Sequence, residues 1–573
     1  MDLSVWYLVG AVLVFFMQCG FAMVETGFTR AKNAGNIIMK NLMDFCIGTV
    51  VFVALGYGIM NSENYLFGLI GRPEYQMFTD FAHFNWSNFF FQLVFCATAA
   101  TIVSGAMAER TKFLAYCIYS GFISAIVYPI EAGWVWNSQG WLVDFGYVDF
   151  AGSSVIHMVG GLSALLGAWI LGPRLGKYTS REDGSLQVNA IPGHSLTLGA
   201  LGCFILWFCW YGFNGAAASD SVQLAQILGV TTLAPAMATV TCMLYTWLKN
   251  GKPDVSMCLN ASLAGLVAIT APCATVDGLG ALIIGGVAGV LVVVVVEVLD
   301  QKLHIDDPVG AVAVHCANGI WGTVADGLFN TQYGLFYGGG LRHLGVQCMG
   351  VAAIAAYTLV AMFLVYRFID ATVGLRVSAE EEIMGLDVTE HGLASAYADF
   401  LPVAPGYGGG TPACGPVDLS DLEPVELTAK EKTDASAPQH KLTRVSIICK
   451  EERFPLLRDA MAAIGVTGMT VSSVMGCGAQ MGKVGQYRGV KLSMNLLPYV
   501  QVDIVVSKVD PALVVAAAEK CLRTGSAGDG KIFLYDVEHV VKVRTGEKDY
   551  DELQDDNYSS CFQIYILLIS LSL

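Results

Sequence analysis

The chain has 573 residues, of which 54% are hydrophobic and only 14% charged, against about 25% charged in ordinary soluble domains. Its mean hydropathy is +0.56. A soluble protein of this length cannot bury so much apolar surface, so composition predicts an integral protein of the lipid bilayer. The formal net charge of −16 argues against a nucleic-acid partner, which would need clustered Lys and Arg. The sixteen cysteines form no CxxC pair, which favours buried small side chains over disulfides or a zinc site.

Long apolar stretches fill residues 1–370, and a helix that crosses a bilayer needs about 20 apolar residues. The first stretch has no small-residue cleavage site before Glu25, so we expect it to be retained rather than removed as a signal peptide. The pattern predicts a bundle of eleven transmembrane helices. Their centres are Phe15, Val51, Ala99, Phe122, Leu162, Leu201, Ala236, Leu263, Gly286, Ala317 and Val360.

Basic residues in the connections predict the orientation of these helices, since cytoplasmic loops carry an excess of Lys and Arg. The even-numbered connections hold only Arg72 and Arg342. We therefore expect the odd-numbered connections and the C-terminus in the cytoplasm, the N-terminus outside, and the chain in the inner (plasma) membrane. The odd-numbered connections hold Arg30, Lys32, Lys40, Arg110, Lys112, Arg174, Lys177, Arg181, Lys249, Lys252 and Lys302.

After residue 370 the composition changes. The acidic segment 371–400 is expected to dock on the cytoplasmic face, and the Pro- and Gly-rich stretch 401–441 predicts a flexible linker. The apolar end of the tail 549–573 is too short to span a membrane, and no role follows from it. Residues 442–548 predict a soluble α/β domain in the ferredoxin-like order β-α-β-β-α-β, with elements expected at 445–449, 454–464, 470–474, 500–506, 511–522 and 532–535.

Two histidines lie inside otherwise apolar stretches, where an ionisable side chain is costly and often marks a pathway for ions or protons. His157 lies in the fifth stretch and His315 in the tenth, and each follows an aspartate, Asp149 or Asp307, by eight residues. This repeated spacing indicates an internal duplication into inverted five-helix repeats that share a site near the midplane. Either histidine alone could instead be a core side chain bonded to a backbone carbonyl. No third ligand accompanies them, so a metal site is not expected.

Aromatic residues suggest the nature of the ligand. Trp136 falls in an outward-facing connection, and Phe95 and Phe213 lie in the third and sixth stretches. An aromatic box at an outer mouth suits a small cation, which is attracted to ring faces. The alternative is the ordinary belt of Trp and Tyr at a membrane interface.

Nine short motifs occur in a fixed order along residues 5–398. They are LVFFMQCGFA at 13–22, RAKN at 30–33, MKNL at 39–42, GAMAER at 105–110, DFAG at 149–152, GFN at 212–214, GLRVS at 374–378, GLD at 385–387 and EHG at 390–392. Together they resemble ammonium transporters of the Amt/Mep/Rh family. The resemblance implies a homotrimer with one pore per subunit. It implies cation recruitment by Trp136, a gate of Phe95 and Phe213, pore-lining His157 and His315, and an outer vestibule shaped by Asp149.

One position departs from this family. Its outer-site serine lies four residues after the gate phenylalanine, and here that position is Ala217. The missing hydroxyl leaves two hypotheses open. The first is a transporter that carries NH₄⁺ to the pore and conducts NH₃. The second is an ammonium receptor that signals with little transport. Neither involves covalent chemistry, so the chain is not expected to be an enzyme.

A second set of motifs follows in residues 442–548: GVTGMTV at 465–471, GCG at 476–478, YRG at 487–489, GDGKIF at 528–533 and RTG at 544–546. They resemble PII signal proteins, which implies ATP or ADP binding between subunits of a trimer, with Mg²⁺ and 2-oxoglutarate at Gln480, and other PII-binding partners. A loop with Tyr487 and Arg488 is implied to plug the cytoplasmic end of the pore. The implied nucleotide-binding positions are Thr470, Gly476, Gly478, Gln480, Gly528, Asp529, Gly530, Lys531, Lys542 and Arg544.

Three departures limit this second resemblance. The lysine that pairs with 2-oxoglutarate is Tyr499, and the tyrosine of covalent regulation is Leu492. Lys542 stands where an arginine is common, so it keeps the charge but loses the bidentate fork. Residues 525–531 also fit GxxxxGK, yet Ile532 stands where a P-loop needs Ser or Thr, and a strand rather than a helix is expected next. We therefore reject an NTPase.

Overall fold

The computed structural model divides the chain into two units, Met1–Ala398 and Asp399–Leu573, which are described separately. The expected linker 401–441 and tail 549–573 lie outside the described residues, apart from residues 441 and 549. The structure describes residues 3–180, 185–393, 396–397, 441–466, 468–476, 484–487, 490–493, 497–525, 528–543 and 546–549.

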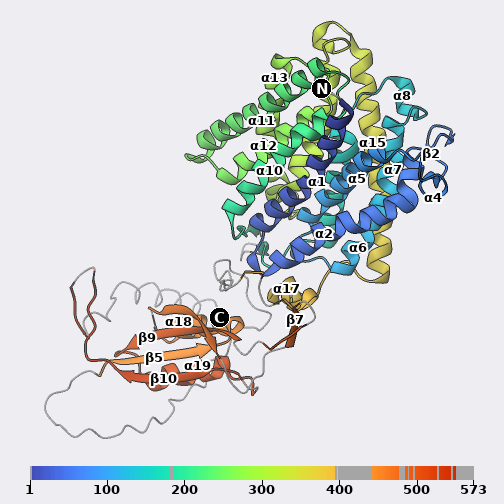
Figure 1. Cartoon of the computed structure of the whole chain (residues 1–573). Helices are drawn as coiled ribbons and strands as arrows, with labels where there is room; N and C mark the ends of the chain where they lie inside the picture. The colour runs from blue at the N-terminus through green and yellow to red at the C-terminus, as the bar shows by residue number, and fades with distance from the viewer. Residues whose placement is uncertain are drawn as a thin grey trace, which may run out of the picture. The chain divides into compact units, whose positions relative to one another are not determined.

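The first unit is a helical bundle (Figure 1). Each of the eleven expected centres lies in one of its helical segments, several of which contain a π-helical turn. In chain order these are α1 (Leu3–Phe28), α2 (Ala34–Val51) with η2 (Phe52–Gly56) and α3 (Tyr57–Met60), α5 (Trp86–Ala106), α6 (Phe113–Phe122) with η3 (Ile123–Val127) and α7 (Tyr128–Trp136), η4 (Ser153–Met158) with α9 (Val159–Leu171), α10 (Leu196–Gly215), α11 (Ser221–Asn250), α12 (Val255–Thr270), α13 (Gly278–Glu297) with η5 (Val298–Lys302), η6 (Val312–Ala317) with α14 (Asn318–Phe329), and α15 (Leu341–Thr372).

Nine helices in the described part of the chain are long and apolar enough to cross a membrane. The expectation of a multi-pass membrane bundle is confirmed at this level. The other two segments fall short for different reasons. Helix α12 is apolar but has only 16 residues, while the segment formed by η6 and α14 carries the polar side chains of Asn318, Thr323 and Asp326.

Two glycines let the helices that carry the histidines approach closely. A Cβ on Gly161 would lie 2.3 Å from the backbone nitrogen of Cys316, and a Cβ on Gly319 would lie 2.4 Å from the carbonyl oxygen of Ser153. Each glycine follows its own histidine by four residues. Small residues at such contacts are typical of helix packing in membranes. The two histidine segments therefore pack against each other through equivalent positions.

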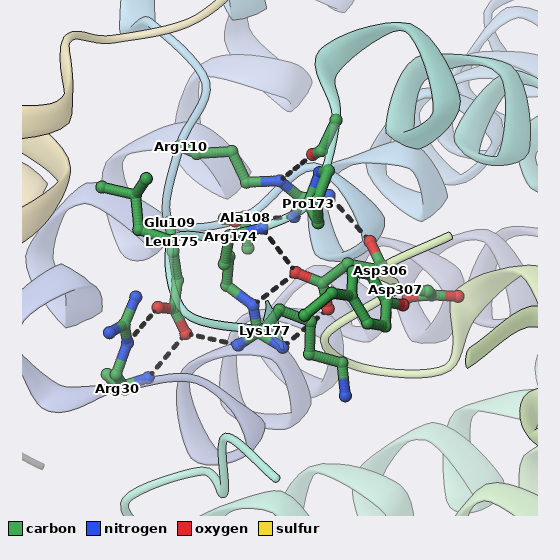
Figure 2. Close-up of polar contacts among 12 residues, drawn as sticks. Arg30, Ala108, Glu109, Arg110, Pro173, Arg174, Leu175, Lys177, Asp306 and Asp307 are labelled. Carbon is green, nitrogen blue, oxygen red and sulfur yellow. Dashed lines mark hydrogen bonds and ion pairs between the residues drawn. The ribbon is translucent and has the colours of Figure 1, made fainter. Parts of the chain in front are cut away.

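A buried network of ion pairs joins four of the connections (Figure 2). Arg174 donates two hydrogen bonds from Nε and Nη2 to the carboxylate of Asp306, at 2.8 and 2.9 Å, and a third to Glu109 at 3.0 Å. Glu109 also accepts from Arg30, and Arg110 donates to the Asp306 carbonyl oxygen at 2.7 Å. Such fork-shaped contacts are the strong form of charge pairing.

Charge pairing in this network outweighs the cost of burial. Burial alone would raise the pKa of Glu109, but the positive charges of Arg174 and Arg30 lower it to about 2. The pKa of Asp306 is likewise held below its usual range against the effect of burial, by Arg174 and Arg110. These carboxylates stay charged, so their ion pairs hold together the connections that join the helix ends.

The segment after α15 is fastened to the same face. It contains α16 (Ala379–Met384) and α17 (Leu386–His391). The carboxylate of Asp387 accepts the backbone N–H groups of Gly35 and Asn36 at 3.0 and 2.8 Å, at the N-terminus of α2, where a helix favours negative charge. Glu382 pairs with Arg376 at 2.6 Å. The acidic side chains thus serve as anchors within this unit.

The second unit contains a four-stranded antiparallel sheet in the order β10-β5-β9-β6, with α18 and α19 packed together. The sequence pattern did not indicate the additional hairpin of β7 and β8. The buried side chains alternate along the strands, for example Val445 and Ile447 beside Val502 and Ile504. The elements are β5 (Thr443–Cys449), α18 (Phe454–Ala463), β6 (Thr470–Gly476), β7 (Val484–Tyr487), β8 (Val490–Ser493), β9 (Leu497–Val506), α19 (Pro511–Leu522) and β10 (Lys531–Asp536).

The buried network makes a prediction about acid stability. Replacing Glu109 with Gln removes one charge and leaves two arginines short of a partner, so we expect Glu109→Gln to destabilise the protein by about 3 kcal/mol at pH 7. Because the pKa of the folded carboxyl is depressed to about 2, its contribution is complete above the unfolded value of about 4.5 and is lost as the pH falls towards 2.

Thermal unfolding of the full chain in detergent between pH 7 and pH 3 checks this. The melting-temperature gap between wild type and Glu109→Gln should shrink in acid. Asp370→Asn, in an exposed pair with Arg367, is the control and should change little. A gap that stays constant across this pH range would contradict the charge assignment.

Candidate functional site

The structure brings the two membrane histidines together. The Nδ1 atoms of His157 and His315 lie 3.2 Å apart, and the ring centroids are 5.2 Å apart with an interplanar angle of 26°. Both side chains are buried. At this distance one nitrogen must donate and the other accept, so the neutral pair shares a single hydrogen. The rings form a connected unit in the middle of the bundle.

The aspartates found by their spacing from the histidines cap the histidine segments. Asp149 accepts the backbone N–H groups of Gly152, Ser153, Ser154 and Val155, at 2.7 to 3.1 Å. In the other half, Asp307 accepts from Gly310 and Val312 at 3.0 and 2.7 Å. Neither carboxylate contacts a histidine in the bonds found here. The eight-residue spacing therefore reflects a helix cap followed by two turns.

Aromatic rings continue the line from the histidines towards α7. The rings of Phe95 and Phe213 stack with centroids 4.4 Å apart, and Phe213 in turn stacks on His157 at 5.5 Å. Trp136 meets the Phe95 ring edge-on at 6.0 Å, and its indole N–H donates to the carbonyl oxygen of Asp149 at 2.8 Å. The order is Trp136, Phe95, Phe213, His157 and His315.

Below His315 the line ends in a cavity. Its lining includes Phe21, Glu25, Asn260 and Val314 as well as His315 itself. Ala217 follows the C-terminal end of α10 by two residues. It is exposed, and its side chain is only a methyl group. The line of rings thus has an aromatic end at Trp136 and a mixed apolar and polar end at the cavity.

Sequence reasoning missed two side chains of this site. Trp210 stacks on His157 at 5.1 Å and donates its indole N–H to Thr270 at 2.9 Å. It lies three residues before Phe213 on α10, a helical spacing that would have pointed to the same face. Glu25 was noted only in connection with signal-peptide cleavage. Its position as an acidic residue within an apolar stretch could have identified it as a candidate site residue.

In the second unit the loop before β10 has the conformation that its glycines allow. Gly528 and Gly530 have φ values of +96° and +117°, and a Cβ on Gly530 would lie 1.8 Å from the carbonyl oxygen of Ile448. Asp529 accepts the backbone N–H groups of Thr524 and Gly525 at 2.7 and 3.0 Å, and these bonds help to lower its pKa. Lys531 begins a strand, as expected, and not a P-loop helix.

The remaining expected nucleotide positions are spread over the sheet. Thr470 begins β6, on the opposite edge from Lys531, so three strand spacings of about 4.8 Å separate the two strands. Gly476 ends β6, and a Cβ there would lie 2.7 Å from the ring of Tyr499. Lys542 forms an ion pair with Glu547 at 3.9 Å. Gly478, Gln480, Arg488 and Arg544 lie outside the described residues, and only the backbone of Tyr487 is described.

Residues 5–397 match the Ammonium Transporter Family, and residues 442–547 match the nitrogen regulatory protein P-II family. The chain belongs to the ammonium transporter family and carries a C-terminal PII domain. It is 42% identical over 436 residues to ammonium transporter Amt2 of Archaeoglobus fulgidus, covering 71% of this chain and 92% of that protein. It is also 35% identical over 417 residues to ammonium transporter 3 of Dictyostelium discoideum, covering 69% and 94%.

Solved structures agree with this assignment. A "Sensor Amt Protein" is 38% identical with a TM-score of 0.64, covering 68% of this chain and 98% of that one. Mep2 of Saccharomyces cerevisiae is 26% identical with a TM-score of 0.60, covering 66% and 88%. Members of the family are transporters rather than enzymes. In the described part of this chain, no group of three or more His, Cys, Asp and Glu side chains is placed to hold a metal ion.

The shared hydrogen makes a prediction about the histidine pair. We expect His157→Ala and His315→Ala each to change conduction or ion selectivity, and the double variant to do no worse than the stronger single one, because contacting residues act non-additively. Uptake of labelled methylammonium into liposomes measures this.

His343→Ala is the matched control, since His343 is also buried but pairs with Asp326 instead of lying in the ring line. Wild-type uptake and selectivity in both single histidine variants would contradict a role for the pair.

Proposed function

We propose that the membrane unit carries ammonium across the bilayer by separating the ion into NH₃ and a proton. The observation that carries this proposal is the unbroken line of rings from Trp136 to His315. A cation gains about 1–2 kcal/mol over an aromatic face when it is partly desolvated. A bare charge in an apolar lumen costs more than that, so NH₄⁺ loses its proton beyond the stacked phenylalanines. NH₃ then passes His157 and His315, which offer hydrogen bonds.

We further propose that the bundle has eleven transmembrane helices arranged as two inverted five-helix repeats. Two observations support the repeat. The histidine segments share an aspartate cap eight residues before the histidine and a glycine four residues after it. The histidines lie in the fifth and the tenth helical segments, so the second point comes five segments after the first, and an odd offset reverses the direction of the second copy. The distribution of basic residues favours an inner membrane location, with the N-terminus outside and the PII domain in the cytoplasm.

The PII domain is proposed to bind ATP or ADP between subunits of a homotrimer. Its strand order matches the ferredoxin-like fold, and the chemistry of Lys531 and Lys542 suits phosphate groups. Thr470 and Lys531 lie on opposite edges of one sheet. A nucleotide that contacts the Thr470 edge of one copy and the Lys531 edge of another is therefore best placed between neighbouring copies. Gly528, Asp529 and Gly530 would shape the phosphate loop, with Gly476, Gly478, Gln480 and Arg544 completing the site and Gln480 holding Mg²⁺.

A second candidate function is an ammonium receptor that signals through the PII domain with little transport. Ala217 favours it, because the outer cation site lacks a hydroxyl group, and one structural relative is named a sensor. Labelled methylammonium flux through the full chain and through a chain that ends at residue 400 separates the two. Flux at the background level in both would favour the receptor.

Tyr499 makes a prediction about effector binding. The side chain that would pair with the 2-oxoglutarate carboxylates is a phenol packed over Gly476, and a neutral phenol gives no charge pairing. We expect calorimetry on residues 442–548 to show ATP or ADP binding with at most a weak response to 2-oxoglutarate. Lys531→Ala should abolish nucleotide binding, with the exposed Lys508→Ala as control. A micromolar 2-oxoglutarate response with Mg-ATP would contradict the prediction.

The fused domain is proposed to regulate its own pore through Arg488 in the loop that follows Tyr487. The linker that composition predicts, of about 40 residues, would reach about 35 Å as a flexible chain, and tethering would give an effective concentration near the millimolar range. We expect Arg488→Ala, or removal of everything after Leu401, to raise ammonium flux at least twofold. Nucleotides should alter the flux of the intact chain only.

Lys491→Ala, in the same hairpin, is the matched control for loss of a positive charge. Equal flux from all of these proteins under every nucleotide condition would refute self-plugging. It would leave a PII domain that acts on other partners.

A further inference from the structure

A stripe of buried polar side chains runs along the helix formed by α6, η3 and α7, apart from the ring line. It consists of Ser120, Ser124, Tyr128 and Glu131, which we call the polar stripe. All four residues are fully buried. Their hydroxyl groups, and both carboxylate oxygens of Glu131, have no hydrogen-bond partner among the residues that the structure describes. The four recur at helical spacing and so share one face of the helix.

Many other buried hydroxyl groups in the bundle bond to their own helix, although those of Thr26 and Ser104 also lack a partner among the described residues. Ser163, Thr98 and Thr358 each donate to the carbonyl oxygen four residues earlier, at 2.7 to 2.8 Å. An unpartnered buried hydroxyl costs about 1–3 kcal/mol, and a carboxylate costs more. Four such groups in one row therefore call for a common partner. Water fits, because it is small and makes two to four hydrogen bonds in a polar cavity.

The row continues beyond Ser120. Tyr116, one turn earlier, donates its hydroxyl to one carboxylate oxygen of Asp44 on α2, and Ser120 neighbours the same carboxyl group. The other oxygen of Asp44 and the Nζ of Lys40 lack hydrogen-bond partners within the described residues, although Nζ lies 5.0 Å from the centroid of the Tyr116 ring. Glu25 of α1 accepts from Asn41 at 3.2 Å and neighbours both Lys40 and Asp44.

One end of the row shares a cavity with the ring line, and the other end lies on the helix that carries Trp136. At one end Glu131 precedes Trp136 by five residues on α7 and lies within electrostatic reach of Asp149. At the other end Glu25 lines the cavity below His315. Between these ends α5 separates the two routes: Phe95 faces the ring line, and Cys96 beside it contacts the Ser124 carbonyl oxygen at 3.7 Å.

We propose that the polar stripe holds a file of water molecules that carries protons between Glu131 and Glu25, around the histidine pair. In each transfer one O–H bond forms on the accepting oxygen as one breaks on the donor, so the net change is one proton moved. Glu131 and Glu25 are the terminal acceptors. Lys40 lies within electrostatic reach of the Glu25 and Asp44 carboxyl groups and would offset their negative charge.

The chain offers a minimal way to block this path. Gly48 of α2 faces Ser124, and a Cβ at Gly48 would lie 3.2 Å from the serine hydroxyl oxygen. Gly48→Ala therefore puts a methyl group against that hydroxyl. Gly121→Ala adds the same methyl group in the neighbouring helix, where the closest atom, of Ile47, would lie at an ordinary 3.9 Å. Glu131→Gln keeps the shape of the stripe and removes a proton acceptor.

The test uses the full chain in phosphatidylcholine and phosphatidylglycerol vesicles with strong internal buffer and a pH-sensitive dye. Proton uptake is driven by a potassium gradient with valinomycin, without ammonium, and labelled methylammonium uptake is measured on the same vesicles. We expect Gly48→Ala and Glu131→Gln each to lower proton uptake at least fivefold. Gly121→Ala should stay within twofold of wild type, and methylammonium uptake should change less than twofold in all three.

Three results would overturn the proposal. They are no proton uptake by the wild type, equal proton uptake in all four proteins, or loss of proton uptake in His157→Ala but not in Gly48→Ala or Glu131→Gln. Glu131→Gln keeps the test decisive if Gly48→Ala fails to fold. The path does not rest on the transport proposal. Proton uptake with the expected pattern but no methylammonium uptake would refute transport and leave the polar stripe standing.

Discussion

The cost of placing a charged or polar group in an apolar medium shapes every part of the membrane unit. Where charge is kept, as at Glu109, Arg174 and Asp306, forked ion pairs hold it between the connections. Where the helices cross the apolar layer, the buried polar groups include the carboxylate caps, the histidine pair, and the polar stripe with its neighbouring carboxyl groups and Lys40. In the proposed mechanism, the same cost that makes these residues rare makes an ammonium ion give up its proton. A single constraint therefore links the architecture to the proposed chemistry.

The sequence was sufficient to predict the helices and the histidine pair, because both depend on patterns along the chain. Apolar runs place all eleven centres in helices, and the repeated Asp-to-His spacing correctly paired residues 158 positions apart. Trp210 was missed because a buried aromatic side chain in an apolar run carries no sign of what it touches. The π-helical turns that contain the two histidines were also unpredictable, since hydropathy reports burial but not the phase of a helix.

In the soluble domain, too, the sequence was sufficient to predict the local elements but not their arrangement. Expected strands and helices agree with the observed ones to within a few residues, because alternation and helical spacing are local properties. Which edges of the sheet carry Thr470 and Lys531 depends on strand order, which local patterns do not contain. That placement matters for the proposed function, because it puts two of the proposed nucleotide-binding positions, Thr470 and Lys531, on opposite edges of one subunit's sheet. A local motif can thus identify a binding residue without revealing which copy of the protein it serves.

The reciprocal contact of Gly161 and Gly319 has a consequence for the history of the fold. Each half supplies a glycine against which the histidine segment of the other half packs closely. A bulky residue at either position would push the two histidine segments apart. The sequences of the two halves therefore cannot diverge independently at these positions. Under the proposed inverted duplication, an ancestor with a single half would have formed the paired histidines by pairing with an inverted copy of itself. Fusion of the two copies into one chain would then have kept them together.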